Sequence, residues 1–415
     1  AVIALQIASF AHMVVVGEQG LVAASYDLVL NTVGLALLWA GRHAFRNPSP
    51  RRARRTIGSL VAPADEDQRA MATELLRHEG TVNRLAWMTT WPENRWFSSR
   101  NRPGYVAYRV HAGVAVGLCD PVAAREEDRS ALLAEFADQV HAQGMVPCLF
   151  TVSAEAARHA RSRGWHALQV AEEAVIELAD LDFVGKAWQD VRTGLNQASK
   201  RNIRFSLGPL GAMPRGLQMQ VKAISSEWVE DMGLPEMGFT LGGVDEALDP
   251  AVRVGLAVDA DATVHGVTSW MPIHDVGGGE PVGWTLDVMR RLPGGFRYSM
   301  EFLIASACLT FRDEGCTAVS LSGAPLARSR QSDGEDLDRG TLDLFLDRLG
   351  ATLEPYYGFR SLHAFKSKFQ PVHDPLYLVF PDEAALPRIG LALSRAYLPE
   401  AGLRDLMALT RPTHA

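Results

Sequence analysis

The chain has few cysteines, and their spacing gives them no evident task. Only four occur in 415 residues, and no two of them form a C-x-x-C pair: Cys119, Cys148, Cys308 and Cys316. Disulfides persist in oxidising compartments, and chains that depend on them carry closely spaced cysteines. Because each of these four lies in an apolar run, we expect reduced, buried thiols in a cytosolic setting.

Common catalytic signatures are also missing. The twelve histidines are scattered, no H-E-x-x-H occurs and no Cys/His group has zinc-ligand spacing, so the sequence predicts no metal site. Residues 277–283 lack the Lys-Ser/Thr of a Walker A loop, and Ser322-Gly323 lacks the flanking glycine of a nucleophile elbow. Arg161-Ser-Arg-Gly164 matches half of an acyl-CoA pyrophosphate loop, but a helix C-cap explains Gly164 more simply.

Composition and charge describe an ordinary globular protein. The chain is 47% hydrophobic and 21% charged, and its length suggests two domains. A formal net charge of −7 argues against non-specific nucleic-acid binding by the whole surface, although a local basic groove is compatible with it.

The N-terminal residues differ from the rest. Residues 1–16 and 28–41 are apolar runs, each slightly shorter than the roughly 20 residues that span a bilayer. Six arginines follow the second run before the first acid, Asp65, as the positive-inside rule expects of a cytoplasmic flank. We therefore expect residues 1–45 to be the end of a membrane region and 46–62 a basic linker. A buried helical hairpin is the alternative.

Strand and helix patterns then alternate twice, which predicts an α/β (α+β) chain with a duplicated fold. We assign a first domain to 63–213, a second to 214–388 and a C-terminal helix or tail to 389–415. Residues 327–340 have no apolar periodicity and are expected to be a mobile loop. Helices are predicted at 62–78, 126–143, 154–163, 215–232, 300–314 and 341–349, and strands at 105–110, 114–118, 145–152, 168–178, 252–259, 263–272, 281–289, 317–321 and 375–380.

Polar phrases follow apolar runs late in the chain, where α/β proteins collect their active-site groups. They are Trp284-Thr-Leu-Asp-Val-Met-Arg-Arg291, Ser320-Leu-Ser-Gly-Ala-Pro-Leu326 and Phe365-Lys-Ser-Lys-Phe-Gln-Pro371. Earlier phrases complete an ordered set: Trp91-Pro-Glu-Asn-Arg-Trp-Phe97, Tyr105-Val-Ala-Tyr-Arg109, Asp120-Pro-Val122, Glu172-Glu-Ala-Val175, Gly185-Lys-Ala-Trp-Gln-Asp-Val-Arg192 and Glu236-Met-Gly-Phe-Thr-Leu-Gly242. In this order and spacing, residues 86–380 resemble the catalytic domain of the phosphatidylglycerol lysyltransferases, the MprF-type aminoacyl-phosphatidylglycerol synthases.

That resemblance implies two tandem acetyltransferase-like (GNAT) domains. It also implies transfer of an aminoacyl group, lysyl in the name-giving members, from aminoacyl-tRNA to a glycerol hydroxyl of phosphatidylglycerol on the cytoplasmic leaflet. Such transfer lowers the negative charge of the membrane and gives resistance to cationic peptides. The donor ester is already activated, so no cofactor is expected. The amino acid transferred and assembly into a homo-oligomer stay open.

The resemblance and the chemistry together suggest site residues. A carboxylate can hold an ammonium group or act as a base, and a cation can hold a phosphate or an oxyanion. The catalytic candidates are Asp287, Arg290, Glu236 and Glu301; the substrate-binding candidates are Lys366, Lys368, Arg192, Asn196, Asp120 and Ser322. Each also has an ordinary structural interpretation, as a salt bridge, a helix cap or a solvated charge. His363 and His373 are further candidate bases, for which a structural role is favoured.

This chain departs from the usual family phrases at several positions: Cys119 and Ala123 around Asp-Pro-Val, Val288 within Asp-Val-Met-Arg, Glu301 in place of Asp, and Ser320-Leu-Ser322 in place of Asn-Leu-Gly. Two other hypotheses therefore stay open. One is a different GNAT-type transferase that uses acyl-CoA or a peptidoglycan precursor, which would need a pyrophosphate loop. The other is a non-catalytic membrane lipid-binding module.

Overall fold

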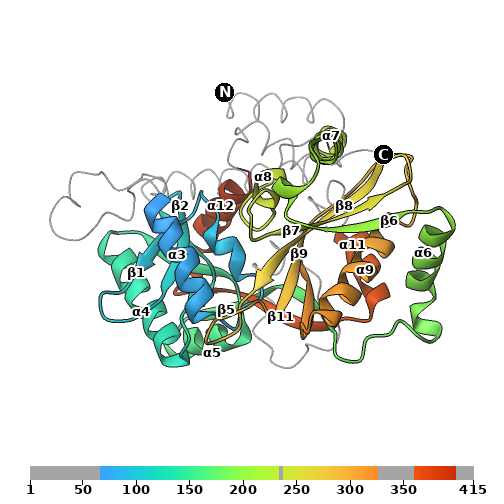
Figure 1. Cartoon of the computed structure of the whole chain (residues 1–415). Helices are drawn as coiled ribbons and strands as arrows, with labels where there is room; N and C mark the ends of the chain where they lie inside the picture. Colours follow the sequence, from blue (N-terminus) through green and yellow to red (C-terminus); the bar gives the residue numbers. More distant parts are fainter. Residues whose placement is uncertain (1–65, 233–236, 326–358, 399–415) are drawn as a thin grey trace, which may run out of the picture. The chain divides into compact units, whose positions relative to one another are not determined.

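The computed structural model describes residues 66–232, 237–325 and 359–398 (Figure 1). Several predictions therefore lie outside the described residues. These are the membrane segment 1–45, the basic linker 46–62, the loop 327–340, the helix 341–349 and the candidate Glu236. Within the described part of the chain, no helix has the length and apolar character needed to cross a bilayer.

One eleven-stranded sheet organises the described residues, in the order β1-β2-β3-β4-β11-β5-β10-β9-β8-β7-β6. The mixed α/β class predicted from the sequence is thus confirmed. The strands are β1 Arg95–Ser98, β2 Tyr105–His111, β3 Val114–Val122, β4 Val146–Val152, β5 His166–Glu177, β6 Arg204–Gly208, β7 Arg253–Val258, β8 Val264–Ile273, β9 Gly283–Arg291, β10 Ala318–Pro325 and β11 Val372–Phe380. The helices are α3 Glu66–Glu79, α4 Glu126–Ala142, α5 Ala154–Ser162, α6 Gln189–Lys200, α7 Arg215–Met232, α8 Val244–Ala247, α9 Ser299–Asp313, α11 Phe359–Lys366 and α12 Leu386–Tyr397, with short 3-10 turns η2 Ala86–Thr90 and η6 Ser367–Phe369 among others.

The same order of elements occurs twice. Among the described elements, β2-β3-α4-β4-α5-β5 in the first half corresponds to β8-β9-α9-β10-α11-β11 in the second. The pairing repeats as well, because β2/β3 and β8/β9 are antiparallel whereas β3/β4 and β9/β10 are parallel. The two-fold rhythm of the sequence therefore reflects a repeated topology, while the domain boundaries stay a prediction.

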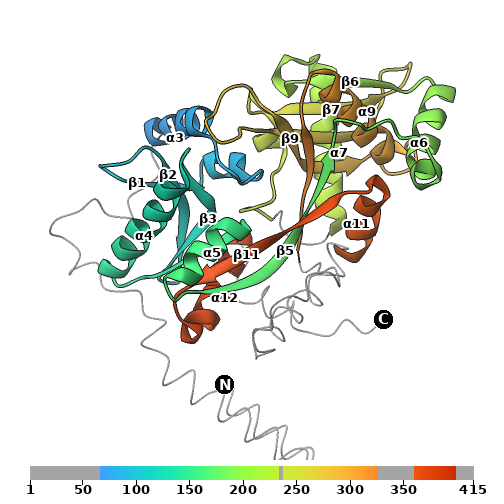
Figure 2. The same ribbon diagram turned by 90° about the horizontal axis from the view of Figure 1, so that it is seen from below.

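The two halves exchange their last strands. β11 lies between β4 and β5, and β5 lies between β11 and β10, each pair being antiparallel. Figure 2 shows β5 and β11 running side by side through the middle of the molecule. Each half therefore completes its part of the sheet with a strand from the other half.

Apolar side chains on the sheet pack beneath the helices that follow the parallel strands. Phe136 of α4 contacts Tyr108, with ring centroids 5.4 Å apart, and Phe311 of α9 stacks on Trp284 at 5.2 Å. These contacts belong to separate apolar clusters, one in each half. The predicted thiol burial is confirmed for Cys119, Cys148 and Cys308, whereas Cys316 is half-buried.

Local signals explain the ends of α5. The Ser153 side chain accepts a hydrogen bond from the Ala156 N–H at the start of the helix. Gly164 follows the helix with a φ of +78°, and its N–H donates to the Arg161 carbonyl at 2.9 Å. The C-cap interpretation of Gly164 is thus confirmed. Arg161 itself lies over the Tyr377 ring, 5.5 Å from its centroid.

Candidate functional site

Asp287 and Arg290 lie on β9 beside a β-bulge. Thr268 of β8 pairs with Met289 and Trp270 with Leu286, so β9 has one more residue than β8 between these pairs. The side chains of residues three apart on a regular strand point to opposite faces. One extra residue between them in a bulge brings both side chains to the same face. The bulge therefore lets both charged side chains reach the same layer of structure.

That layer consists of α7 and residues 237–246. An Asp287 carboxylate oxygen accepts the Gly242 N–H at 2.9 Å. The Arg290 guanidinium donates to the Ser225 hydroxyl and lies 4.6 Å from the centroid of the Trp228 ring. The two predicted catalytic residues thus hold the two segments in place on the sheet.

A cavity of about 600 Å³ lies against these segments. Ser225, the partner of Arg290, belongs to its wall, and so do the two neighbours of Gly242, the partner of Asp287. Arg290 therefore supports the wall directly, and Asp287 supports it through the adjoining backbone. Its charged lining is mixed but mainly acidic: Glu93, Glu230, Asp245 and Glu246 against Arg109 and Lys222. Such a lining suits a ligand with ammonium groups and a single anionic group.

Arg109 of β2 is the most buried cation of the cavity, with 8% of its surface exposed. It donates to the Asn94 side chain at 2.9 Å and to Glu93 at 3.4 Å, and its guanidinium lies 5.3 Å from the Phe239 ring centroid. Burial lowers the pKa of Arg109, and the Glu93 and Glu246 carboxylates oppose that shift. The sequence reasoning did not select Arg109, although it ends one of the family-like phrases.

Lys366 of α11 lies in a different place, at the bulge of β10. Its ammonium group donates to the Ser322 and Gly323 carbonyls at 3.3 Å, and only 4% of the residue is exposed. Burial lowers the pKa of Lys366 to about 8, despite the opposing effect of Glu173. Ser322 has a φ of +66° where the register of β10 shifts, which aims its carbonyl at the lysine. Two separate substrate-binding candidates, Lys366 and Ser322, thus lie in contact through the Ser322 backbone carbonyl.

Glu173, whose charge affects Lys366, belongs to an ion-pair cluster with Arg84 and Asp374 that the sequence did not predict. Arg84, just before η2, donates to Glu173 of β5 at 3.0 Å and to Asp374 of β11 at 2.9 Å. These bonds join this part of the chain to both exchanged strands. Burial raises the pKa of Glu173, and Arg84 opposes that shift. Only the phrase Glu172-Glu-Ala-Val175 hinted at this group.

The remaining candidates have separate surroundings. Lys368 and Glu301 form an ion pair at 2.7 Å. Arg192 donates to the Phe183 and Gly185 carbonyls, and Asn196 lies exposed on the same helix, α6. Asp120 is buried in the first half, where it accepts hydrogen bonds from the Asn83 and Ser153 side chains and the Ser153 N–H. Burial raises the pKa of Asp120 against these hydrogen bonds.

Several known proteins resemble this chain in sequence. Residues 73–380 match the family described as the C-terminal region of phosphatidylglycerol lysyltransferase. An uncharacterized protein of Corynebacterium glutamicum is 41% identical over 357 residues, which are 85% of this chain and 44% of the relative. The lysylphosphatidylglycerol biosynthesis bifunctional protein LysX of Nocardia farcinica is 27% identical over 332 residues, 79% of this chain and 28% of the relative. The chain thus spans less than half the length of these curated relatives.

Two solved structures share the fold. One is the C-terminal domain of a protein described as a lysylphosphatidylglycerol synthetase of Agrobacterium fabrum, with a TM-score of 0.68 and 20% identity, covering 81% of this chain and 98% of that one. The other is L-PGS of Bacillus licheniformis, with a TM-score of 0.66 and 19% identity, covering 82% of this chain and 97% of that one. At these identities the likeness establishes the common architecture.

Proposed function

The chain belongs to the family of phosphatidylglycerol lysyltransferase C-terminal regions, and on that premise we propose that it is an aminoacyltransferase. It transfers a lysyl group from aminoacyl-tRNA to the glycerol hydroxyl of phosphatidylglycerol at the cytoplasmic face of the membrane. The product turns an anionic lipid into a cationic one, which lowers the negative charge of the membrane and gives resistance to cationic peptides.

This proposal rests on the cavity lining, which carries charges of both signs with an excess of carboxylates. The lining has four carboxylates against two cations, an acidic excess that suits the two ammonium groups of a lysyl ester, while the lipid bears one phosphodiester, which Arg109 can bind. A neutral acyl group would leave the carboxylates without a cationic partner in the ligand. The acidic excess therefore favours a cationic amino acid.

The reaction is an ester exchange. The lipid hydroxyl oxygen forms a bond with the carbonyl carbon of the lysyl ester, and the bond from that carbon to the ribose oxygen of the tRNA breaks. The proton of the lipid hydroxyl ends on the ribose oxygen that leaves. No oxidant, nucleotide or additional leaving group is needed, so the contribution of the protein is orientation and electrostatic stabilisation.

The residues divide these tasks. Arg109 is rigidly held by Asn94 and Phe239, so it can meet a phosphate without reordering. Asp287 and Arg290 are positioning residues, because Arg290 binds Ser225 of the wall and Asp287 binds Gly242, which lies between two wall residues. Their loss should lower kcat and raise KM together.

The decisive experiment is to incubate the protein with lysyl-, arginyl- or alanyl-tRNA and vesicles of phosphatidylglycerol, and to identify the lipid product by mass. We expect lysyl-phosphatidylglycerol, its loss after RNase treatment, and a strong decrease with Asp287→Ala. Glu227→Gln on the exposed side of α7 is the matched control. Absence of an aminoacyl lipid with every charged tRNA would refute the proposal, and a product with alanyl-tRNA alone would refute the choice of lysine.

A further inference from the structure

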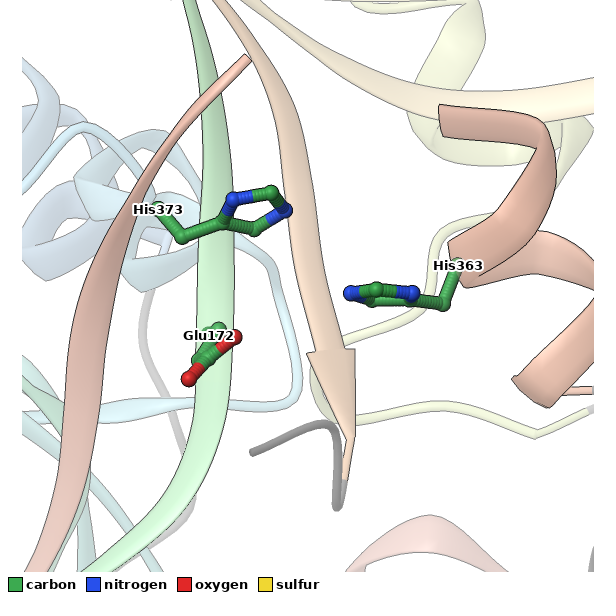
Figure 3. Close-up of side chains that lie close together, drawn as sticks. All are labelled: Glu172, His363 and His373. Carbon is green, nitrogen blue, oxygen red and sulfur yellow. The ribbon is translucent and has the colours of Figure 1, made fainter. Parts of the chain in front are cut away.

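Three potential metal ligands meet away from the cavity, on the exchanged strands. Glu172 comes from β5, His373 from β11 and His363 from α11, and none of them lines the cavity described above. Figure 3 shows the three side chains pointing into one space between the two strands and the helix. We propose that Glu172, His363 and His373 form a binding site for one divalent transition-metal ion, with Zn²⁺ the fitting occupant.

Strand alternation explains how these side chains meet. His373 pairs with Ala174 and Asp374 with Glu173 across the β5/β11 ladder. Side chains two apart on a strand share a face, so Glu172 and His373 lie on one face. Glu173 and Asp374 lie on the other, where both bind Arg84. The exchange of strands therefore creates the juxtaposition, since Glu172 belongs to the first half and both histidines to the second.

The ligand atoms lie close enough together to approach one ion. The ligand atoms of the three side chains all lie within 4.8 Å of one another. Ligands about 2.1 Å from one Zn²⁺ ion lie at most about 4.2 Å apart. The two imidazole rings are already stacked, with centroids 5.5 Å apart and an interplanar angle of 27°.

Burial and hydrogen bonding favour a ligand at this point. Nε2 of His373 is buried, and it neither donates nor accepts a hydrogen bond among the residues that the structure describes. Such a polar atom is costly unless something binds it. Glu172 is only 2% exposed, and Gln169 donates to its Oε1 at 3.3 Å. A second polar group that orients a ligating carboxylate is a usual feature of metal sites.

The ligand types favour a transition-metal dication. Glu173 and Asp374 are already paired with Arg84 on the other face, so Glu172 is the carboxylate that meets an ion. Two imidazoles with one carboxylate select a transition metal over Mg²⁺ or Ca²⁺, which prefer oxygen ligands. Three protein ligands around Zn²⁺ leave a fourth position for water. The ion would join α11 to β5 and β11, and so fasten the exchanged strands.

Calorimetric titration of the chelator-treated protein with Zn²⁺ tests the proposal, with thermal unfolding as a second readout. We expect one ion per chain and a higher Tm with Zn²⁺. His363→Ala and Glu172→Gln should each weaken binding by more than the ~10–100-fold that an outer-shell change costs, and should abolish the Tm increase. Mg²⁺ in place of Zn²⁺ should give neither effect. The His363 side chain is half-exposed on α11, so we expect His363→Ala to fold. Thermal unfolding of this variant without metal checks that it does.

A second group of possible ligands serves as the matched control. Glu126, Glu155 and His159 also lie close together, but Arg129 already binds Glu155 at 2.8 Å and His159 contacts Glu126 at 3.0 Å. His159→Ala should therefore bind Zn²⁺ like the unmodified protein. Lack of Zn²⁺ binding, unchanged binding by His363→Ala, or loss of binding by His159→Ala would each overturn the proposed site. None of these outcomes depends on the aminoacyltransferase activity.

Discussion

Replacing Gly242 with alanine should strongly lower the activity of the protein by displacing Asp287. Gly242 lies against the aspartate so closely that a Cβ added there would be 2.0 Å from one carboxylate oxygen and 2.9 Å from its carbon. Its N–H is also the donor to the other carboxylate oxygen, at 2.9 Å. Only glycine permits both the close approach and this hydrogen bond.

The size of the effect follows from the displacement. Ordinary van der Waals contact begins at 3.4 Å, so the carboxylate has to retreat by about 1.4 Å. That movement breaks the hydrogen bond and releases the cavity wall. A misplacement of about 1 Å costs on the order of 100-fold in rate, or about 2.7 kcal/mol of transition-state stabilisation. We expect kcat/KM of Gly242→Ala to fall by about that factor.

The assay is formation of lysyl-phosphatidylglycerol from lysyl-tRNA and lipid vesicles, at several concentrations of each substrate. Gly216→Ala on α7 is the control, because its added Cβ meets no atom within 4 Å. In an Asp287→Ala background, Gly242→Ala should cost little more, since the clash has gone. Full activity of Gly242→Ala, or a full additional loss in the double variant, would refute the proposed coupling.

Three other changes test individual groups. Burial lowers the pKa of Lys366 to about 8, against about 10.4 in an unfolded chain, so the unfolded state holds more protons between these values. We therefore expect the free energy of unfolding of the unmodified protein, measured in urea, to rise relative to that of Lys366→Met from about pH 8 to about pH 10.4. Below pH 8 the difference between the two proteins should not change. A difference that stays constant over the whole range would contradict a lowered pKa of Lys366. Glu301→Gln breaks the ion pair with Lys368 and should cost about 1 kcal/mol by urea unfolding, and much of this should return in the double variant with Lys368→Met. Arg109→Lys loses the planar contact with Phe239 and the bond to Asn94, so KM for the lipid should rise about 10-fold with little change in kcat; an unchanged KM would exclude Arg109 from lipid binding.

Local patterns predicted much of the fold. The helix expected at 154–163 is α5, Ala154–Ser162, and the one expected at 300–314 is α9, Ser299–Asp313, because apolar spacing and terminal glycines mark both. Helix α6, Gln189–Lys200, was missed. Its polar composition and the internal Gly194 weaken the helical pattern, while packing against Glu301 holds that glycine in place.

Long-range relations were beyond sequence reasoning. The exchange of β5 and β11 depends on which strands pair, and strand pairing between residues 200 apart has no local signature. The same holds for the meeting of Glu172 with His363 and His373, whose spacing resembles no metal motif. The catalytic role of Asp287 and Arg290 stays a prediction, and their contacts with Gly242 and Ser225 depend on a bulge that the sequence does not mark.

The exchanged strands also constrain how the chain is made. During synthesis β5 is complete well before β10 and β11, its neighbours in the sheet of the described residues, have left the ribosome. The nascent first half therefore presents an open strand edge for the time needed to synthesise some 200 further residues, which is the kind of edge that recruits other chains. We expect a fragment that ends before α7 to aggregate when produced alone and to remain monodisperse when the complementary fragment is produced with it.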